Sequence, residues 1–360
     1  MKILIIKFRN IGDVLLSTPL IENLKIKYPD AKIGFALNKG CEAMITQNPN
    51  VNKIHIYDRN KLKKMSFLKR IFSEIGFAKE IKKEKYDVAI NLTSGDRGIL
   101  IAKFANIKKI IGIKGKKNQL ISKFITDEVP KFKGFRHVVE QNLDALKTLN
   151  FEPFSKKVSV YSNENVDFLY LPKKFIHIHP TSRWMFKCIN DNMMAKIIDL
   201  CEKELGIKIV LTADKNESEM KKINSILSLC KSKPINLAGK LNLKQIVTLS
   251  KKSSLYIGVD TAIMHIAAAN DVPCIAFFGP SGAFEWGPWD NSLTKSAYTK
   301  KNGIQKMGKH IVIQKNWDCV PCGNDGCNGS KISKCLMEFE KEFLSSFKNL
   351  IKKKLDLVTF

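Results

Sequence analysis

The sequence contains no long apolar run. In its 360 residues, no stretch approaches the roughly 18 consecutive apolar residues that a membrane-spanning helix needs. The opening stretch MKILIIKF is too short for a signal peptide, Lys7 and Arg9 interrupt it, and no small-residue cleavage site follows. These absences predict a cytoplasmic protein without a transmembrane segment, in which the N-terminal stretch forms a first buried strand.

Several nucleotide-handling and hydrolytic motifs are also missing. No GxGxxG follows the first strand of either half of the chain, which argues against a dinucleotide-dependent oxidoreductase. The sequence has no Walker lysine loop and no G-x-S-x-G elbow. No Asp-x-Asp pair ends a strand, so we expect no divalent metal and no other cofactor to be required for catalysis.

Arginine is scarce although the chain is strongly basic. Lysine and arginine together number 61 and the formal net charge is +27, yet arginine occurs at only six positions. Sequence-specific nucleic-acid binders usually use the bidentate arginine fork. We therefore interpret the lysine excess mainly as a composition that keeps the surface solvated. Attraction of an anionic sugar donor, or of a membrane leaflet that carries an anionic glycolipid, is the functional alternative. A non-catalytic basic protein that binds nucleic acid or membrane is the alternative.

The nine cysteines fall into two groups. Five are scattered, mostly in apolar contexts, and are expected to be buried thiols. The other four form a C-x2-C-x4-C-x7-C pattern: Cys319, Cys322, Cys327 and Cys335. In a reducing compartment this spacing favours a structural metal site or a thiol cluster over disulfides, although it matches no zinc finger closely. A merely structural loop is the alternative.

Strand and helix patterns alternate along the chain, which is typical of parallel sheets covered by helices on both faces. The expected strands are residues 2–8, 32–37, 53–57, 86–92, 109–113, 175–179, 207–212, 234–237, 255–259 and 273–278. The expected helices are 14–28, 66–84, 99–105, 138–149, 192–204, 217–229, 243–250 and 262–269. A polar, proline-containing stretch at 150–173 interrupts the series. The pattern predicts two doubly wound, Rossmann-like domains, 1–165 and 166–345, that face a cleft, followed by a basic helix or tail at 346–360.

The stretch IGVDTAIMHIAAAND, residues 257–271, predicts a strand that feeds directly into a helix. The first helical N–H groups then have no intrahelical partner, and with the helix dipole they form a site for a phosphate. Asp260 and Thr261 stand at the turn, Ala262 leaves the backbone open to a ligand, and His265 shares a helix face with Thr261. A capped helix with a stray histidine is the alternative.

The loop HIHPTSRWMFK, residues 177–187, follows the first strand of the second domain. Thr181 and Ser182 offer hydroxyls, while Arg183 and Lys187 offer cations. Two cations and a helix N-terminus can neutralise a departing nucleoside diphosphate without a metal. A solvated basic turn is the alternative, which the two large aromatics in the loop disfavour.

The loop KFRNIGDVLLSTP, residues 7–19, places Asp13 at a helix N-terminus. By itself such a carboxylate is a helix cap. Opposite a donor site, it is the general base that a displacement at a sugar carbon needs.

These stretches together resemble glycosyltransferase family 9. The similarity runs in order through IGDVLLSTP, HPTSRWMFK, GVDTAIMHIAAA, VPCIAFFGPS and CVPC, over about residues 1–340. The HPTSRWMFK form is most similar to the core heptosyltransferase III branch of that family.

The resemblance implies a GT-B fold, a metal-independent inverting mechanism and an ADP-heptose donor. It implies a lipid A-core acceptor of the lipopolysaccharide inner core, at the inner face of the cytoplasmic membrane, and we expect a peripheral, monomeric enzyme. Asp13 would be the base and Lys187 would assist departure of the leaving group. The implied donor contacts are Thr181, Ser182, Arg183, Lys187, Asp260, Thr261, Ala262 and His265.

The chain departs from the family pattern in two ways. Ala262 replaces a glycine, and the acidic ribose contact is ambiguous among Asp214, Glu217 and Glu219. A family 9 transferase that uses another nucleotide sugar is the alternative among enzymes.

Overall fold

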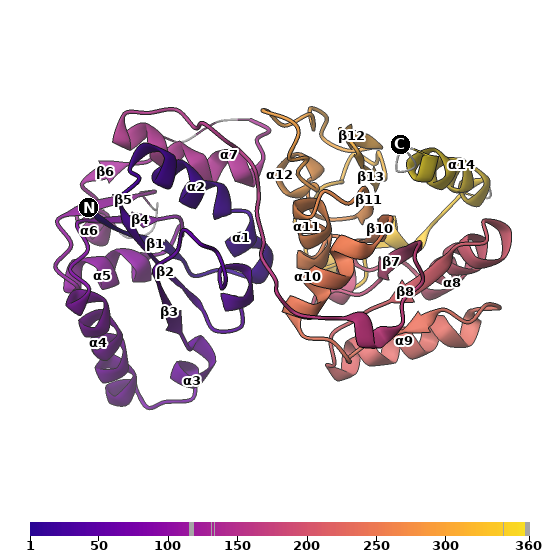
Figure 1. The fold of residues 1–360 in the computed structure, drawn as a ribbon, viewed down its shortest axis with the longest axis horizontal. Coiled ribbons are helices and arrows are strands. Elements are labelled where there is room, and N and C mark those ends of the chain that lie inside the picture. The colour runs from indigo at the N-terminus through magenta and orange to yellow at the C-terminus, as the bar shows by residue number, and fades with distance from the viewer. Residues whose placement is uncertain (115–118, 131, 133, 341, 357–360) are drawn as a thin grey trace. The chain divides into compact units, whose positions relative to one another are not determined.

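The computed structural model describes residues 1–114, 119–130, 132, 134–340 and 342–356. They form two compact units (Figure 1). The N-terminal unit comprises Met1–Gly134 and Val138–Tyr161, and the C-terminal unit comprises Ser162–Phe360 together with Phe135–His137. The main division therefore follows residue 161, within the polar stretch that the sequence marks as a linker.

The N-terminal unit is built on a parallel sheet with the strand order β3-β2-β1-β4-β5-β6. Its strands are β1 (Lys2–Lys7), β2 (Lys32–Asn38), β3 (Lys53–Tyr57), β4 (Val88–Asn91), β5 (Lys109–Gly112) and β6 (Asp127–Glu128). The central strand is apolar and buried from Ile3 to Ile6, as expected for a strand that helices cover on both faces.

Helices cover both faces of this sheet. They are α1 (Ile11–Leu15), α2 (Thr18–Lys27), α3 (Arg59–Lys63), α4 (Phe67–Lys83), α5 (Asp96–Phe104), α6 (Gln119–Ser122) and α7 (Val138–Leu143), with 3₁₀ turns η1 (Glu42–Met44) and η2 (Asp144–Leu149). In Figure 1, α2 and α7 lie on one side of the strands, and α4 and α5 lie on the other.

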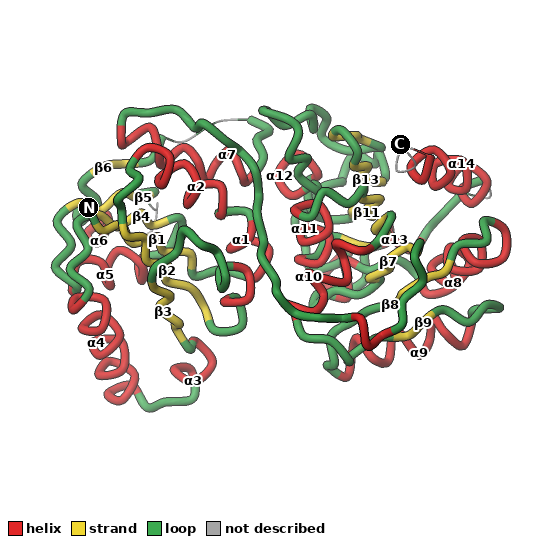
Figure 2. The backbone as a smooth tube through the Cα atoms, in the orientation of Figure 1, coloured by secondary structure: helices red, strands yellow, loops and turns green. Residues whose placement is uncertain are grey.

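The C-terminal unit has a second sheet, in the order β12-β13-β11-β10-β7-β8-β9. Its strands are β7 (Phe175–His179), β8 (Lys208–Leu211), β9 (Ile235–Asn236), β10 (Leu255–Val259), β11 (Cys274–Phe278), β12 (Gln305–Met307) and β13 (His310–Gln314). All pairings are parallel except that of β12 with β13. Figure 2 shows the strands of each unit enclosed by helices, so the predicted class of two doubly wound α/β sheets is confirmed.

The helices of this unit are α8 (Asp191–Asp199), α9 (Glu217–Leu229), α10 (Leu243–Lys252), α11 (Ala262–Ala269), α12 (Ala283–Trp286), α13 (Lys334–Met337) and α14 (Phe343–Asp356). A π-helical turn, η5 (Leu200–Glu204), extends α8, and short 3₁₀ turns occur at η3 (Asp167–Leu169), η4 (Met185–Lys187) and η6 (Cys327–Gly329). The expected tail at 346–360 is largely α14, whose Phe347, Ile351 and Leu355 are buried in the core of the unit; residues 357–360 lie outside the described residues.

The structure differs from the predicted elements in several places, among them the helix expected at 14–28 and the β12–β13 pair. The single helix expected at 14–28 is two helices, because Pro19 is the second residue of α2 and cannot continue the hydrogen bonding of a preceding helix. The Ser17 and Thr18 hydroxyls instead bond to the last carbonyls of α1, at 2.7 and 2.8 Å. The antiparallel pair of β12 and β13, which are three and five residues long, was not predicted.

Candidate functional site

Four loops of the C-terminal unit leave the same edge of its sheet. Strands β8, β7, β10 and β11 are neighbours and run parallel, so the loops that follow them start side by side. In doubly wound sheets ligands bind beyond this carboxyl edge. The residues predicted to contact a donor lie in two of these loops and at the start of α11, which places them together.

An ion pair joins two of these loops. The Lys187 ammonium lies 2.6 Å from Asp260 Oδ2, and the two side chains are 22% and 8% exposed. Burial opposes ionisation of Asp260, but Lys187 and a hydrogen bond from Ser281 outweigh it and hold the pKa of Asp260 below its ordinary value. Asp260 is therefore a carboxylate that fixes the lysine in place. A carboxylate repels phosphate, so in this pair Lys187 is the group able to bind an anion and Asp260 is able to accept a sugar hydroxyl.

The start of α11 offers open donors next to this pair. Thr261 is the extended N-cap residue, with φ −151° and ψ 164°, and its hydroxyl makes no capping hydrogen bond. Thr261 and Ala262 are both half-buried. This eight-residue helix therefore begins with N–H groups and a hydroxyl that suit a phosphate oxygen.

His265 lies one turn into α11 and is buried. Burial is the main reason that the pKa of His265 falls to about 4, so the imidazole is neutral near pH 7. Its Nδ1 atom has no hydrogen-bond partner among the described residues. A buried neutral imidazole with an unused nitrogen can donate to or accept from a ligand hydroxyl.

Thr181 belongs to a buried hydrogen-bond network. Its hydroxyl donates to Glu219 Oε2 at 2.6 Å, and the same oxygen accepts the backbone N–H of Asp214 at 2.9 Å. His179 links this network to Thr212: its Nε2 lies 3.5 Å from the Thr181 hydroxyl, and its Nδ1 lies 2.9 Å from the Thr212 hydroxyl. The Thr212 hydroxyl also lies 2.7 Å from His177 Nε2. The proton of Thr181 is thus used within the protein, and its side chain holds the loop after β7 in position.

The next two residues of this loop differ in exposure. Ser182 is buried, and its hydroxyl accepts the backbone N–H of Trp184 at 3.2 Å. Arg183 is exposed, and its guanidinium lies 5.2 Å from the centre of the Trp184 ring. Ser182 therefore shapes the turn, whereas Arg183 is a solvent-facing cation stacked on an aromatic surface.

The three acidic residues considered for the ribose contact lie in different surroundings. Glu219 is buried and bound to Thr181, Glu217 is exposed and paired with Lys221 at 2.8 Å, and Asp214 is exposed. Of the three, Glu219 is the one whose carboxylate accepts a hydrogen bond from the loop after β7. Which of them contacts a ribose stays a prediction.

Asp13 lies at the start of α1 in the N-terminal unit and is half-buried. Its carboxylate accepts the backbone N–H of Asn10 at 3.3 Å, which is a long bond for an N–H donor. The N-cap residue is Asn10, so Asp13 is not the N-cap but the third residue of α1, whose carboxylate binds back to the N-cap N–H. The weak bond leaves the carboxylate available for a second task.

Lys7 in the N-terminal unit and Ser281 in the C-terminal unit each lie at the carboxyl edge of their own sheet, and the sequence interpretation missed both. Lys7 ends β1, is 4% exposed, and donates to Asn142 Oδ1 at 3.0 Å and to the Leu92 carbonyl at 3.2 Å. Burial lowers the pKa of Lys7 to about 8, against an opposing contribution from the Asp13 charge. Lys7 is the last residue of β1, and Ser281 lies three residues after the end of β11. Their position at the end of a predicted strand was the sequence feature that could have identified them.

His137 was also missed. It belongs to the C-terminal unit although it precedes the main division after residue 161. Its Nε2 lies 2.8 Å from the Gly287 carbonyl oxygen. Its ring lies 4.9 Å from that of Trp289, and its charge would further disfavour a charged His265. No local pattern in the sequence could place it there.

The four clustered cysteines all lie in the part of the chain that the structure describes. Cys319 and Cys322 are exposed, Cys327 is half-buried and Cys335 is buried. The backbone N–H of Lys334 donates to Cys327 Sγ at 3.4 Å. Burial, and then the charges of the other three thiols, raise the pKa of Cys335 to about 11. Within the described ranges, no three His, Cys, Asp or Glu side chains are grouped so that they could hold a metal ion, and the structural metal stays a prediction.

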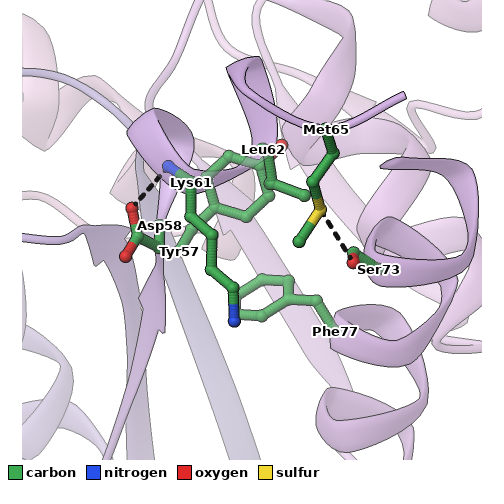
Figure 3. Close-up of a pocket in the computed structure, with 7 residues that line it drawn as sticks. All are labelled: Tyr57, Asp58, Lys61, Leu62, Met65, Ser73 and Phe77. Carbon is green, nitrogen blue, oxygen red and sulfur yellow. Dashed lines mark hydrogen bonds between the residues drawn. The ribbon is translucent and has the colours of Figure 1, made fainter. Parts of the chain in front are cut away.

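A separate hollow of about 140 Å³ lies in the N-terminal unit, where β3 ends (Figure 3). Its lining residues come from β3, the α3 region and α4: Tyr57, Asp58, Lys61, Leu62, Met65, Ser73 and Phe77. The Asp58 side chain caps α3 by accepting the Lys61 N–H at 3.0 Å. The hollow is mostly apolar and contains none of the residues predicted to bind a donor.

Comparison with known proteins identifies the family. The model of glycosyltransferase family 9 (heptosyltransferase) matches residues 75–313. Lipopolysaccharide heptosyltransferase 3 of Escherichia coli is 30% identical over 293 residues, which cover 78% of this chain and 84% of that protein. The protein of the same name from strain K12 is 30% identical over 315 residues, with coverages of 85% and 89%.

Solved structures agree in fold. A family 9 glycosyl transferase from Veillonella parvula DSM 2008 superposes with a TM-score of 0.77 at 20% identity, over 99% of this chain and 96% of that one. E. coli heptosyltransferase WaaC, solved with ADP, superposes with a TM-score of 0.72 at 15% identity, over 98% and 100%. No described helix is both long and apolar enough to cross a bilayer. The two Rossmann-like units thus have the predicted GT-B class, and the chain belongs to glycosyltransferase family 9, the heptosyltransferases.

Proposed function

We propose that this glycosyltransferase moves heptose from ADP-heptose to the inner core of lipopolysaccharide or lipooligosaccharide. The observation that carries the proposal is the Lys187–Asp260 pair beside the open N-terminus of α11. This arrangement offers a fixed cation, helix N–H groups and a sugar-directed carboxylate at one sheet edge. The E. coli relatives are named lipopolysaccharide heptosyltransferases, and WaaC was solved with ADP.

The proposed reaction is a single displacement with inversion. Asp13 takes the proton of the acceptor hydroxyl, whose oxygen attacks the anomeric carbon of heptose. The bond from that carbon to the diphosphate oxygen breaks, and its electron pair leaves with ADP. Lys187 and the N-terminus of α11 stabilise the charge that develops on the diphosphate.

The remaining donor contacts divide by chemistry. Thr261 and the backbone at Ala262 suit phosphate oxygens, and His265 and Asp260 suit sugar hydroxyls. Ser182 shapes the loop that carries Lys187, and Arg183 is a cation at its exposed side. Thr181 acts as a positioning residue, since its proton is held by Glu219.

The test is transfer by the purified protein. ADP-heptose should be consumed with release of ADP when lipid-linked cores truncated at the inner core are supplied, and product mass should identify the added sugar. A panel of other nucleotide sugars tests the alternative donor: faster transfer from another donor would overturn the ADP-heptose assignment but not the transferase. Nucleic-acid binding without any transfer would favour the non-enzymatic alternative.

We further propose that catalysis needs no metal, because Lys187 and α11 supply the positive charge. Transfer should continue in EDTA. A loss that magnesium or manganese restores would contradict this. A loss that only zinc restores would indicate a structural site at the four cysteines, which metal analysis of the purified protein tests directly.

Because the proposed acceptor is a lipid, we also propose that the enzyme works at the inner surface of the cytoplasmic membrane. We propose that it does so as a monomer. Sedimentation at working concentrations tests the monomer.

A further inference from the structure

Helix α4 is apolar on two different faces. On its inner side Ile81 belongs to the core cluster of the N-terminal unit, Phe77 packs against that cluster, and Ala78 is buried. Its outer residues are largely exposed: Phe67 76%, Leu68 67%, Ile71 39%, Phe72 72% and Ile75 39%. A solvent-facing helix normally carries polar residues on its outer side, so this second apolar face needs an explanation.

The exposed residues form one continuous stripe. Leu68, Ile71, Phe72 and Ile75 follow an i, i+3, i+4, i+7 spacing, and Phe67 lies beside Ile71 one turn earlier. Figure 1 shows α4 at the margin of its unit, on the side of the sheet away from α2 and α7. The stripe is about 12 Å long, at roughly 1.5 Å per residue.

The charges around the stripe are mainly positive. Exposed Lys79, Lys82 and Lys83 continue the same half of the helix toward its C-terminus. Glu74 and Glu80 point elsewhere: Glu74 accepts from the Tyr57 hydroxyl at 3.0 Å, and Glu80 lies 3.0 Å from His55 Nδ1. Glu74 borders the stripe, three residues after Ile71, but it is also paired with Arg70 at 3.4 Å and Arg97 at 3.7 Å, so the exposed charges that continue the stripe are lysines.

More lysines precede the stripe. Lys61, Lys63 and Lys64, in and just after α3, are all exposed. An apolar stripe with lysines at both ends is the pattern of a helix that lies in a membrane interface, with its apolar side chains among the acyl chains and its cations near anionic headgroups.

We propose that the outer face of α4, formed by Phe67, Leu68, Ile71, Phe72 and Ile75, docks the enzyme on an anionic lipid bilayer. This inference rests on the proposed lipid-linked acceptor for its biological purpose, but its physical basis is the face itself. A second copy of the chain is a poorer partner. A symmetric pairing would bring the same lysines of both copies together, whereas an anionic bilayer complements them.

The experiment is co-sedimentation with vesicles of phosphatidylcholine alone or mixed with phosphatidylglycerol. The full-length protein should bind the anionic vesicles, and less so in high salt or on neutral vesicles. The double variant Leu68→Glu/Phe72→Glu should reduce binding at least about tenfold, because it places two carboxylates in the interface. The milder Leu68→Ala/Phe72→Ala should reduce it less and guards against misfolding of the first.

The matched control is Phe168→Glu/Tyr170→Glu, which changes two side chains that are 58% and 92% exposed in the other unit. It makes the same change in charge and should leave vesicle binding intact. Binding of ADP should be unchanged in all variants. Transfer to a delipidated, water-soluble core should also be unchanged, while transfer to acceptor in vesicles should fall with the α4 variants.

Three results would overturn the proposal: no binding of the unaltered protein to anionic vesicles, equal binding by the Leu68→Glu/Phe72→Glu variant, or a dimer that this variant dissociates while vesicle binding persists. Failure of the proposed function looks different. It would leave vesicle binding dependent on α4 while ADP-heptose is not consumed.

Discussion

The carboxylates at the carboxyl edges of the two sheets are held differently. In the C-terminal unit, charged groups are held by partners within the protein, as in Lys187–Asp260 and Thr181–Glu219. In the N-terminal unit, Asp13 accepts one long bond from a backbone N–H. The difference fits two tasks: a diphosphate is bound best by groups fixed beforehand, whereas a base must keep a lone pair for an incoming proton.

The largest expected effect is at the sparsely bonded edge. Asp13→Asn should lower turnover by about 10²–10⁴-fold, the usual contribution of a general base. Donor affinity should stay near that of the unaltered protein, because the donor contacts lie in the other unit. Turnover and ADP-heptose affinity measure the two quantities separately.

Asp30→Asn is the control, since Asp30 is an exposed carboxylate of the same unit. If both variants keep most of their activity, Asp13 is a helix cap only, and the contrast between the two edges has no catalytic meaning.

The second effect is at the paired edge. Lys187→Ala should weaken ADP binding roughly ten- to hundredfold and also slow transfer, because a charge-assisted contact contributes about 1.5–3 kcal/mol. Lys352→Ala, at an exposed position on α14, should change little. Calorimetric titration with ADP measures the binding of both variants, and release of ADP from ADP-heptose measures transfer.

This variant also leaves Asp260 buried without its cation, which the double variant Lys187→Ala/Asp260→Asn isolates. If the double variant binds ADP as tightly as the unaltered protein, the single loss came from the unpaired carboxylate, and Lys187 does not bind the diphosphate.

A smaller effect should follow from Glu219→Gln. The amide keeps the shape but replaces a charged acceptor of the Thr181 hydroxyl by a neutral one, so we expect about three- to tenfold weaker ADP binding, in line with about 1 kcal/mol for one hydrogen bond. Glu217→Gln is the matched control, because that side chain is exposed and paired with Lys221. Equal losses in both variants would indicate overall charge in place of loop positioning.

The smallest effect concerns stability. Lys187 is held by a carboxylate, whereas Lys7 is held by a carbonyl and an amide oxygen, which are neutral. Unfolded Lys7 keeps its proton to about pH 10.5, but burial lowers its pKa in the folded protein to about 8. Between these values the unfolded chain binds more protons, so stability rises with pH. The gain should be about 1 kcal/mol over the pH unit above 8.

Urea denaturation at pH 8 and pH 9 measures this gain, and Lys7→Met should reduce it. An equal pH dependence in the variant would mean that Lys7 is not the group responsible.

Much of this fold could be predicted from the sequence because regular elements follow local patterns. β7, β10, α9 and α11 begin and end at the predicted residues. In each, a change in apolar period coincides with a capping or turn residue, such as Asn216, whose side chain accepts the Glu219 N–H at the start of α9.

The site was predictable in part for the same reason. A polar loop after a buried parallel strand must lie at the carboxyl edge, and this placed Lys187 and Asp260 together without knowledge of distances. The sequence could not show that the two bind each other, or that Thr181 gives its proton to Glu219. Such pairings depend on side-chain contacts between residues 73 and 38 positions apart.

The outward stripe of α4 was also missed, although its sequence was visible. The sequence predicts a helix at 66–84, but local pattern alone does not distinguish its exposed apolar positions from its buried ones. Only the packing shows that Phe77 and Ile81 form the side of α4 that contacts the core, whereas Leu68 and Phe72 are exposed.

The excursion of Phe135–His137 into the C-terminal unit bears on how the chain can be divided. A fragment ending at Tyr161 would carry Phe135 and His137 away from Phe284 and Trp289, whose rings lie 4.3 and 4.9 Å from theirs. Each fragment would then display half of a small aromatic cluster. A gene split after codon 161 would therefore separate residues that pack within one unit, and a split after codon 134 would do the same to residues 138–161, which pack in the N-terminal unit.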